Sequence, residues 1–282
     1  MSETTVPWTC PTCHTRVATP FCATCGEEPH PPQELTLRGV AEKVLHAVTS
    51  IDARVARSAW RLLRQPGELT RAWVAGTRKP YVAPFQLFLV ANVLFFAVQW
   101  LTGMNIFSST LDSHLHQQDW SELATSLLKQ RLDKSQTPLA LYAPVFDRAV
   151  VLNAKSLIVL MTLPFALLLP LMFFGDRRPF MAHLVFSLHH YTFLLLLFCV
   201  ALLAARLSAA LGGGGLDSPR VDNVLTVINL VACGLYLFAA IGPVYGASGA
   251  MRVVKAIVLT LAVGLIVLGY RFVLFLITLY GT

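Results

Sequence analysis

Long apolar stretches without charged residues dominate the last two thirds of the chain. No Asp, Glu, Lys or Arg occurs between Lys79 and Asp112, Lys155 and Asp176, Arg178 and Arg206, or Asp222 and Arg252, and a further stretch, from Ala256 to Tyr280, contains only Arg271. A helix needs about 20 apolar residues to cross a hydrocarbon layer about 30 Å thick. The pattern therefore predicts about five transmembrane helices, at residues 84–103, 157–174, 184–205, 224–242 and 256–280.

These helices predict an all-α polytopic membrane protein, and the composition agrees. Hydrophobic residues make up 55% of the chain and charged residues 13%, whereas an ordinary soluble domain has roughly 25% charged residues. The composition excludes a soluble globular enzyme, a disordered chain and a secreted disulfide scaffold. Pro164 and Pro170 lie in the second span and predict a kinked helix, because proline removes a backbone hydrogen bond.

The formal net charge is +7, and the basic residues gather before the first span. Residues 35–83 contain Arg38, Lys43, Arg54, Arg57, Arg61, Arg64, Arg71, Arg78 and Lys79. Because short loops rich in Lys and Arg stay on the cytoplasmic side, we expect the N-terminus in the cytoplasm. Alternation then places residues 104–156 in an exported loop and the C-terminus outside, in the periplasm. Residues 1–30 lack the apolar core of a signal peptide.

Two Cys-x-x-Cys pairs near the N-terminus carry the strongest local chemistry: Cys10 with Cys13, and Cys22 with Cys25. Four thiolates at this spacing can complete a tetrahedral shell around zinc, and a closed shell makes the metal structural. Cytoplasmic thiols also stay reduced. A c-type haem attachment motif, formed by Cys10, Cys13 and His14, and redox-active pairs are the alternatives. The haem alternative requires an exported segment, so we predict a zinc ribbon over residues 1–34.

Apolar and basic residues then follow each other at helical spacing from Leu37 to Arg64. This pattern predicts a basic amphipathic juxtamembrane region over residues 35–83, with a helix in the cytoplasmic headgroup layer. The helix is expected to contact anionic lipids of the phospholipid bilayer. Alternatively, its apolar side packs against a soluble partner or against the protein's own helices. The transmembrane domain follows, over residues 84–282.

The residues around the start of the first span resemble a known family. The tract contains Pro66, Gly67, Arg71, Trp73, Gly76, Arg78, Tyr81, Pro84 and Phe85, and a later span contains Phe186, His189 and Phe193. In this the chain resembles the bacterial inner-membrane proteins of domain of unknown function thirty-six sixty-seven, whose pattern combines an N-terminal zinc ribbon, this tract and a later Phe-x-x-His-x-x-x-Phe signature. The family has Tyr where this chain has Trp73. The resemblance implies an architecture and a bacterial inner membrane, but no reaction.

Polar side chains within the predicted spans fall on helical faces, in two layers. The inner layer contains Asn92, His189, His190 and Tyr236, beneath Arg71, Arg78, Lys79 and Tyr81 at the cytoplasmic face. Our hypothesis is that these residues form one ligand-binding site. The cations would bind a phosphate or carboxylate, and His189 would supply a hydrogen bond or a proton relay. The alternative is hydrogen bonding between helices that only fixes their packing.

The outer layer contains Gln99, Asn229 and Arg271. Two polar stripes lead towards it, one formed by Thr226, Asn229, Cys233 and Tyr236 and the other by Thr260, Gly264 and Arg271. Arg271 lies close enough to the outer interface for its long side chain to extend into the headgroups.

The sequence contains no Ser-His-Asp set, His-Glu-x-x-His motif, paired membrane aspartates or nucleotide-binding loop, and this favours a non-enzymatic binding or scaffold module. In this interpretation the ribbon binds a cytoplasmic protein partner, while the helices contact lipid or an anionic ligand. Nucleic acid is not expected as a partner. The alternatives are a transporter or lipid-handling protein, and an intramembrane enzyme that acts on lipid headgroups.

Overall fold

A computed structural model describes residues 7–10, 13–19, 21–24, 53–77, 80–104, 106–107, 109–174 and 178–282. The chain forms two compact units, Met1–Ala53 and Arg54–Thr282. In the first unit, strands β1 (Trp8–Thr9) and β2 (Arg16–Val17) pair antiparallel, with Trp8 opposite Val17 and Thr9 opposite Arg16. The buried residues of this hairpin are Cys10, Val17 and Cys22.

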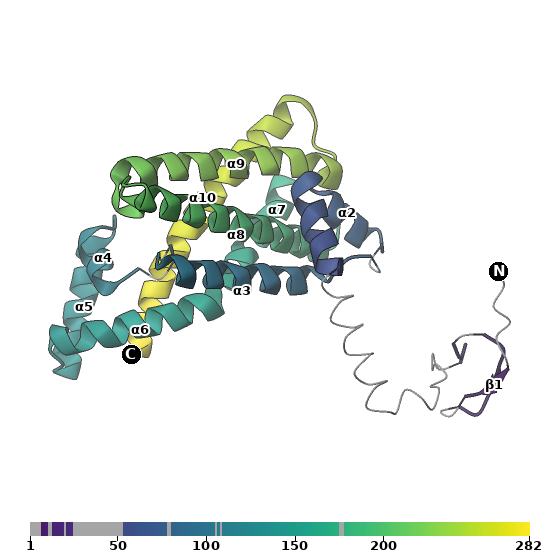
Figure 1. Ribbon diagram of the computed structural model, residues 1–282, viewed down its shortest axis with the longest axis horizontal. Helices are drawn as coiled ribbons and strands as arrows, with labels where there is room; N and C mark the ends of the chain where they lie inside the picture. The colour runs from purple at the N-terminus through teal and green to yellow at the C-terminus, as the bar shows by residue number, and fades with distance from the viewer. Residues whose placement is uncertain are drawn as a thin grey trace. The chain divides into compact units, whose positions relative to one another are not determined.

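The second unit is a bundle of helices (Figure 1). Its elements are α2 (Glu68–Val74), α3 (Pro84–Thr102), α4 (Leu111–His116), α5 (Ser121–Ser135), α6 (Leu139–Leu157), the 3₁₀ turn η2 (Ile158–Met161), α7 (Thr162–Met172), α8 (Phe180–Ala210), the 3₁₀ turn η3 (Gly215–Asp217), α9 (Pro219–Tyr245) and α10 (Gly249–Gly281). Residues 53–64 are also helical. Among the described residues, α3, α8, α9 and α10 are long and apolar enough to cross a membrane, and α6 with α7 adds a fifth span if that bent pair is one. The predicted all-α fold class with about five spans is confirmed.

The second predicted span, residues 157–174, corresponds to η2 and α7. A bend precedes it, because Leu139–Lys155 and Ile158–Met172 meet at 57°. This bend lies several residues before Pro164 and Pro170, both of which belong to α7. The kink that we expected at these prolines therefore stays a prediction.

Residues 104–156, which we expected to form an exported loop, fold into α4, α5 and most of α6. Polar residues support these helices. The carboxylate of Asp147 on α6 accepts a hydrogen bond from the backbone N–H of Leu111 at 2.8 Å, which satisfies an unpaired donor at the start of α4. Asn153 donates to Thr278 Oγ1 at 3.0 Å, so the same helix is also joined to α10.

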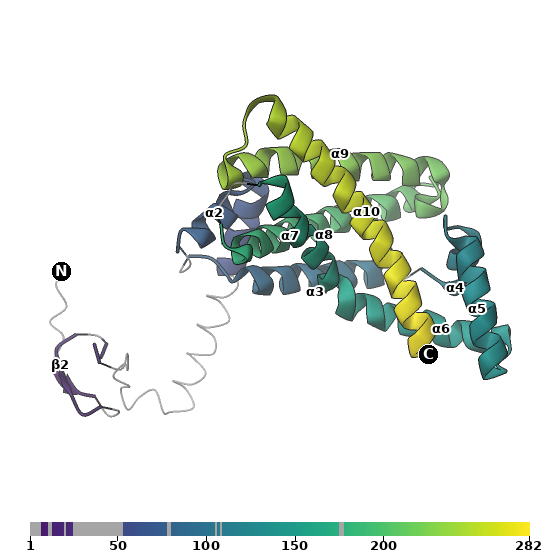
Figure 2. The same ribbon diagram turned by 180° about the vertical axis from the view of Figure 1, so that it is seen from behind.

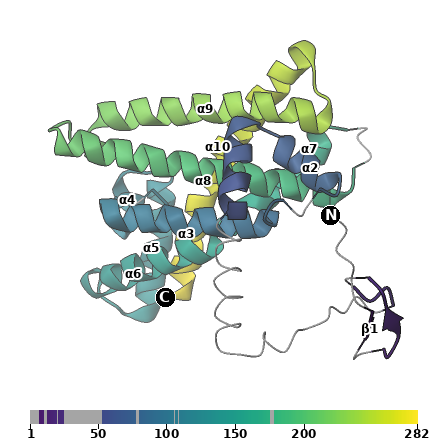
Figure 3. The same ribbon diagram turned by 45° about the vertical axis from the view of Figure 1, so that its right-hand side comes forward.

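Helix α8 is central to the second unit and packs against α2, α3, α7 and α9. Figure 2 and Figure 3 show that α2 and the turn between α9 and α10 lie near one end of this bundle, and α4 near the other. We call these the α2 end and the α4 end. Helix α10 finishes at the α4 end, where the hydroxyl of Tyr142 on α6 donates to the carbonyl of Leu279 at 3.2 Å.

An arginine from α10 donates hydrogen bonds to the backbone of α9 near a proline. Pro243 has no N–H, so the carbonyl of Ala239 lacks its helical donor. The guanidinium of Arg252 supplies one at 3.1 Å and also donates to the carbonyl of Phe238 at 2.6 Å. A side chain at Gly242 would lie only 2.7 Å from this guanidinium, so glycine leaves room for it. The turn between the two helices is thereby fixed at the α2 end.

His114 on α4 is buried among aromatic rings at the α4 end. It is 1% exposed, and its ring centroid lies 4.9 Å from that of Phe275 on α10. The indole N–H of Trp120 donates to Nδ1 of His114 at 3.3 Å, which requires a neutral acceptor nitrogen. Burial, together with the charge of Arg271, lowers the pKa of His114 to about 4.

We predict that acid destabilises the second unit through His114. Because the folded-state pKa lies below the ordinary value, the neutral ring contributes stability at neutral pH that is lost as pH falls from about 6.5 towards 4. Thermal unfolding of the purified protein should show His114→Gln losing about 1 kcal/mol less between pH 7 and pH 5 than the wild type. His116→Gln, at an exposed neighbour, should keep the wild-type pH dependence; equal slopes for wild type and His114→Gln would contradict the prediction.

Candidate functional site

The cysteine hairpin of the first unit brings three thiols together. The sulfur atoms of Cys10, Cys13 and Cys22 lie within 4.8 Å of one another, and those of Cys13 and Cys22 are 3.3 Å apart. A tight turn produces this arrangement: the N–H of His14 donates to the carbonyl of Cys10 at 2.9 Å, and the N–H of Cys10 donates to the carbonyl of Thr15 at 3.0 Å. His14 takes a left-handed conformation with φ of 57°, which lets the chain reverse.

The chemistry of this cluster suits a metal ion. Hydrogen bonds with Thr15, followed in size by the one with Cys22, lower the pKa of Cys13 to about 6. A lower pKa favours the thiolate, which is the form that binds metal. Three of the four predicted ligands therefore meet in a group that could hold a metal ion, and the fourth, Cys25, lies outside the described residues.

A second candidate site lies at the α2 end of the helical unit, where α2 docks on α8. The hydroxyl of Thr70 on α2 and Nδ1 of His189 on α8 are hydrogen bonded at 2.8 Å, and both residues are buried. Gly67, at the start of α2, has φ of 85°, and a side chain there would meet the carbonyl oxygen of Ala240 on α9 at 2.4 Å. This contact, which we call the α2 dock, joins α2 to both α8 and α9.

The signature residues of α8 organise the helices around it. Phe186, His189 and Phe193 share one helical face because they are three and four positions apart. Phe186 stacks on Phe165 of α7 with ring centroids 6.4 Å apart, and Phe193 stacks on Tyr236 of α9 at 3.8 Å. With His189 bonded to α2, the signature contacts three neighbouring helices.

The helix over residues 53–64 holds the turn that precedes α3. The guanidinium of Arg54 donates to the carbonyl of Tyr81 at 2.6 Å. The hydroxyl of Ser58 accepts from the N–H of Val82 at 3.1 Å and donates to the carbonyl of Arg54 at 2.8 Å. Leu62 is 1% exposed and belongs to the core of the helical unit. The described part of the amphipathic tract therefore packs against the protein's own helices, one of the two alternatives that the sequence left open.

The structure brings only some of the predicted ligand-binding residues together. His190 and Tyr236 are neighbours, with ring centroids 5.8 Å apart. Arg71 is paired with Glu68 at 2.8 Å, and the side chain of Tyr81 is buried. Within the described ranges no hydrogen bond or ion pair joins Arg71 or Tyr81 to His189. Arg78 and Lys79 lie outside the described residues.

Several buried polar atoms at this end have no hydrogen-bond partner among the described residues. They are Oδ1 of Asn92, Nε2 of His189 and Nδ1 of His190. His189 and His190 are 2% and 1% exposed, so neither ring lines an open cleft. The geometry favours a packing role for His189, with Thr70 as the partner that sequence reasoning missed. The signal that could have identified Thr70 is its position in the first turn of a helix that follows Pro66 and Gly67.

The comparison with known families identifies the segment that builds the α2 dock. Residues 52–96 match the model of a family described as protein of unknown function (DUF3667). This confirms the resemblance to that family, and the match covers the helix over residues 53–64, α2 and most of α3. No curated protein matches the chain. No solved structure matches it either.

We predict that the α2 dock tolerates no side chain at Gly67. Gly67→Ala adds a clash with the Ala240 carbonyl to the strain of a left-handed backbone, while Gly76→Ala, at φ of 89° with open space around it, adds strain alone. Strain should cost Gly76→Ala about 1 kcal/mol, and the clash should cost Gly67→Ala about 1–3 kcal/mol more. Thermal unfolding of both variants measures the difference, and equal losses would refute the dock.

Proposed function

We propose that the protein is a non-enzymatic binding module of the bacterial inner membrane, with a structural zinc ribbon on the cytoplasmic side. The observation that carries the proposal is the cluster of three thiols in the hairpin. The burial of His189 and its bond to Thr70 support a binding role over catalysis, because the best acid–base candidate at the α2 end is engaged in helix packing.

Zinc is the metal that best suits the hairpin. Sulfur ligands at about 2.3 Å from a tetrahedral ion lie about 3.8 Å from each other, and the sulfurs of Cys13 and Cys22 are 3.3 Å apart. Cys10 and Cys22 also supply most of the buried core of this short hairpin. Metal ligation would therefore hold a fold whose apolar core is too small to be stable alone. With all four cysteines engaged, zinc would be structural, and the ribbon would be free to bind a cytoplasmic protein partner.

Basic residues at the α2 end support contact with anionic lipid headgroups or a similar ligand at the cytoplasmic leaflet. Arg57, Arg64 and Arg71 are exposed in the described segment that precedes α3. Each basic residue near an anionic membrane surface contributes on the order of 1 kcal/mol to attachment. Arg78 and Lys79 belong to the same basic segment of the sequence.

We predict that the full-length protein binds about one zinc ion per chain through the predicted cysteines. Elemental analysis of the purified protein should find the zinc nearly absent in Cys10→Ser, Cys13→Ser, Cys22→Ser and Cys25→Ser. Cys199→Ser and Cys233→Ser are matched controls, because these cysteines lie buried in α8 and α9, and they should retain the wild-type zinc content. Full zinc content in Cys22→Ser would overturn the metal site.

We predict that the two ends of the chain lie on opposite sides of the membrane, since five passes are expected from the apolar helices. A reporter that fluoresces only in the cytoplasm should be bright at the N-terminus and dark after Thr282. A chain truncated after Gly246 lacks α10, and a reporter at its end should become bright. Fluorescence from both ends of the intact chain would contradict an odd number of passes.

A further inference from the structure

A large cavity opens at the α4 end, far along α8 from the α2 dock. Its volume is about 720 Å³, within the range of roughly 300–1,000 Å³ typical of small-molecule sites. Helices α8, α9 and α10 form its walls, together with Leu216 and described residues between Ile106 and Gln118. The two stripes noted in the sequence face each other across it: Thr226, Asn229 and Cys233 on α9, and Thr260, Gly264 and Arg271 on α10.

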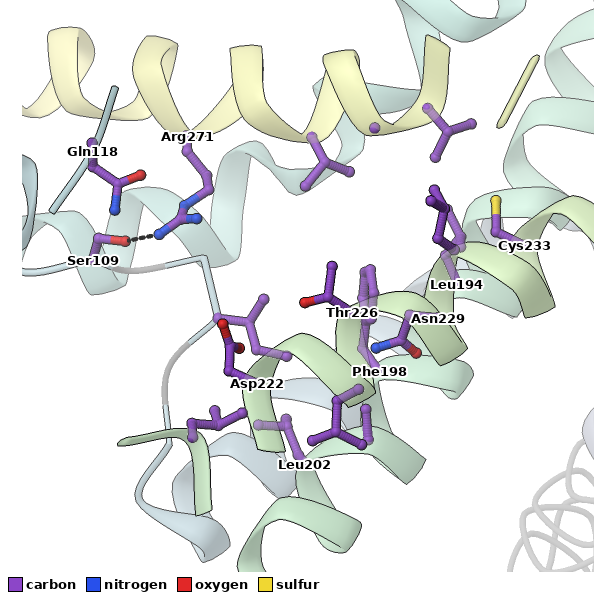
Figure 4. A pocket seen from close by; sticks show the side chains of 18 of the residues that line it. Ser109, Gln118, Leu194, Phe198, Leu202, Asp222, Thr226, Asn229, Cys233 and Arg271 are labelled. Carbon is purple, nitrogen blue, oxygen red and sulfur yellow. Dashed lines mark hydrogen bonds between the residues drawn. The ribbon is translucent and has the colours of Figure 1, made fainter. Parts of the chain in front are cut away.

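The described lining contains one positive and one negative side chain. Arg271 enters from α10 and Asp222 from α9 (Figure 4). The guanidinium of Arg271 donates to Ser109 Oγ at 2.7 Å, while its Nε is buried without a hydrogen-bond partner among the described residues. Arg271 thus points into the cavity, where a guanidinium can hold a phosphate through paired hydrogen bonds. We had expected this side chain to extend into the outer headgroups.

The polar wall on α9 is left uncovered by protein. Asp222 and Thr226 are exposed, as are the apolar Val224 and Val227 on the same stretch of helix. Apolar and polar residues of this stretch of α9 are therefore both left uncovered by protein. The apolar side chains can contact lipid tails, but the polar side chains require a polar partner. Polar groups at membrane depth need a polar partner, because hydrocarbon cannot satisfy them. The occupant of the cavity must therefore offer hydrogen bonds and charge.

An apolar groove continues from the cavity between α9 and α10. The two share Leu230 and Thr260, and the groove, with a volume of about 390 Å³, extends to Phe238 on α9 and Val253 on α10. Asp222 and Phe238 are 16 positions apart, which corresponds to about 24 Å along the axis of α9. A polar recess leading into an apolar channel of this length is the shape of an amphiphile with one extended chain.

We propose that this cavity binds one phospholipid with a zwitterionic headgroup, its phosphate at Arg271, its ammonium at Asp222 and an acyl chain along the α9–α10 groove. A purely anionic headgroup would meet the carboxylate of Asp222 and be repelled, whereas phosphate and ammonium together match the lining. This site lies at the end opposite the proposed cytoplasmic contacts and does not depend on the zinc ribbon.

Filling the cavity without disturbing the fold tests the location of the site. A side chain at Gly264, in the cavity wall, or at Gly269, outside it on the same helix, would meet no atom within 4 Å. We expect native mass spectrometry of full-length, delipidated protein with added phosphatidylethanolamine to show at least tenfold less of the one-lipid complex for Gly264→Leu than for Gly269→Leu. Equal binding by these two variants would overturn the proposal.

The headgroup assignment is tested with the same measurement. Wild-type protein should retain phosphatidylethanolamine at least tenfold better than phosphatidylglycerol, which has the phosphate but no ammonium, and inorganic phosphate should not compete at equal concentration. Arg271→Gln should lose both lipids, Asp222→Asn should lose only the preference, and Arg206→Gln, an exposed arginine outside the cavity, should behave as wild type. Equal retention of the two lipids, or displacement of the lipid by free phosphate, would overturn the assignment of a zwitterionic headgroup. Circular dichroism of each variant checks that it folds.

Discussion

Polar side chains inside an apolar helical bundle must find their partners within the protein, and this constraint accounts for much of the architecture. At the α2 end two such partnerships join helices. Thr70 on α2 meets His189 on α8, and the carbonyl left open by Pro243 receives Arg252. Each bond joins elements that are distant in sequence or separated by a turn. These hydrogen bonds thus specify which helices are neighbours, because apolar contacts alone would be compatible with many arrangements of the helices.

The α4 end meets the same constraint only in part. The network there includes Asp147 with Leu111 and Asn153 with Thr278, which join α6 to α4 and α10. Between α9 and α10, however, Arg271 has one hydrogen-bond partner among the described residues, although its guanidinium has several donors, and Asp222 remains exposed. The polar side chains that line this cavity are therefore available to a ligand, whereas His189 and His190 at the α2 end are buried away from any open cleft.

The sequence predicted the helices better than it predicted their contacts. Apolar runs depend on length and composition, so the spans now seen as α3, α8, α9 and α10 could be placed directly. Helix α6 was missed because Asp147, Arg148 and Lys155 interrupt its apolar pattern. In the folded chain the carboxylate of Asp147 caps another helix. A local pattern cannot reveal such a partner, since the two residues are 36 positions apart.

For the candidate sites too, the sequence predicted local patterns but not contacts between distant residues. Cysteine spacing is local, so the three thiols that meet in the hairpin could be named from the sequence. The stripes on α9 and α10 could also be identified from the sequence as helical faces. The sequence did not show that the two stripes face each other across one cavity. It also did not show that a hydrogen bond with Ser109 would turn Arg271 inward. The sequence singled out His189 as a polar residue within a span, but its hydrogen-bond partner Thr70 is 119 positions away. Helical periodicity can say which residues share a face, and only the packing of the helices decides what that face meets.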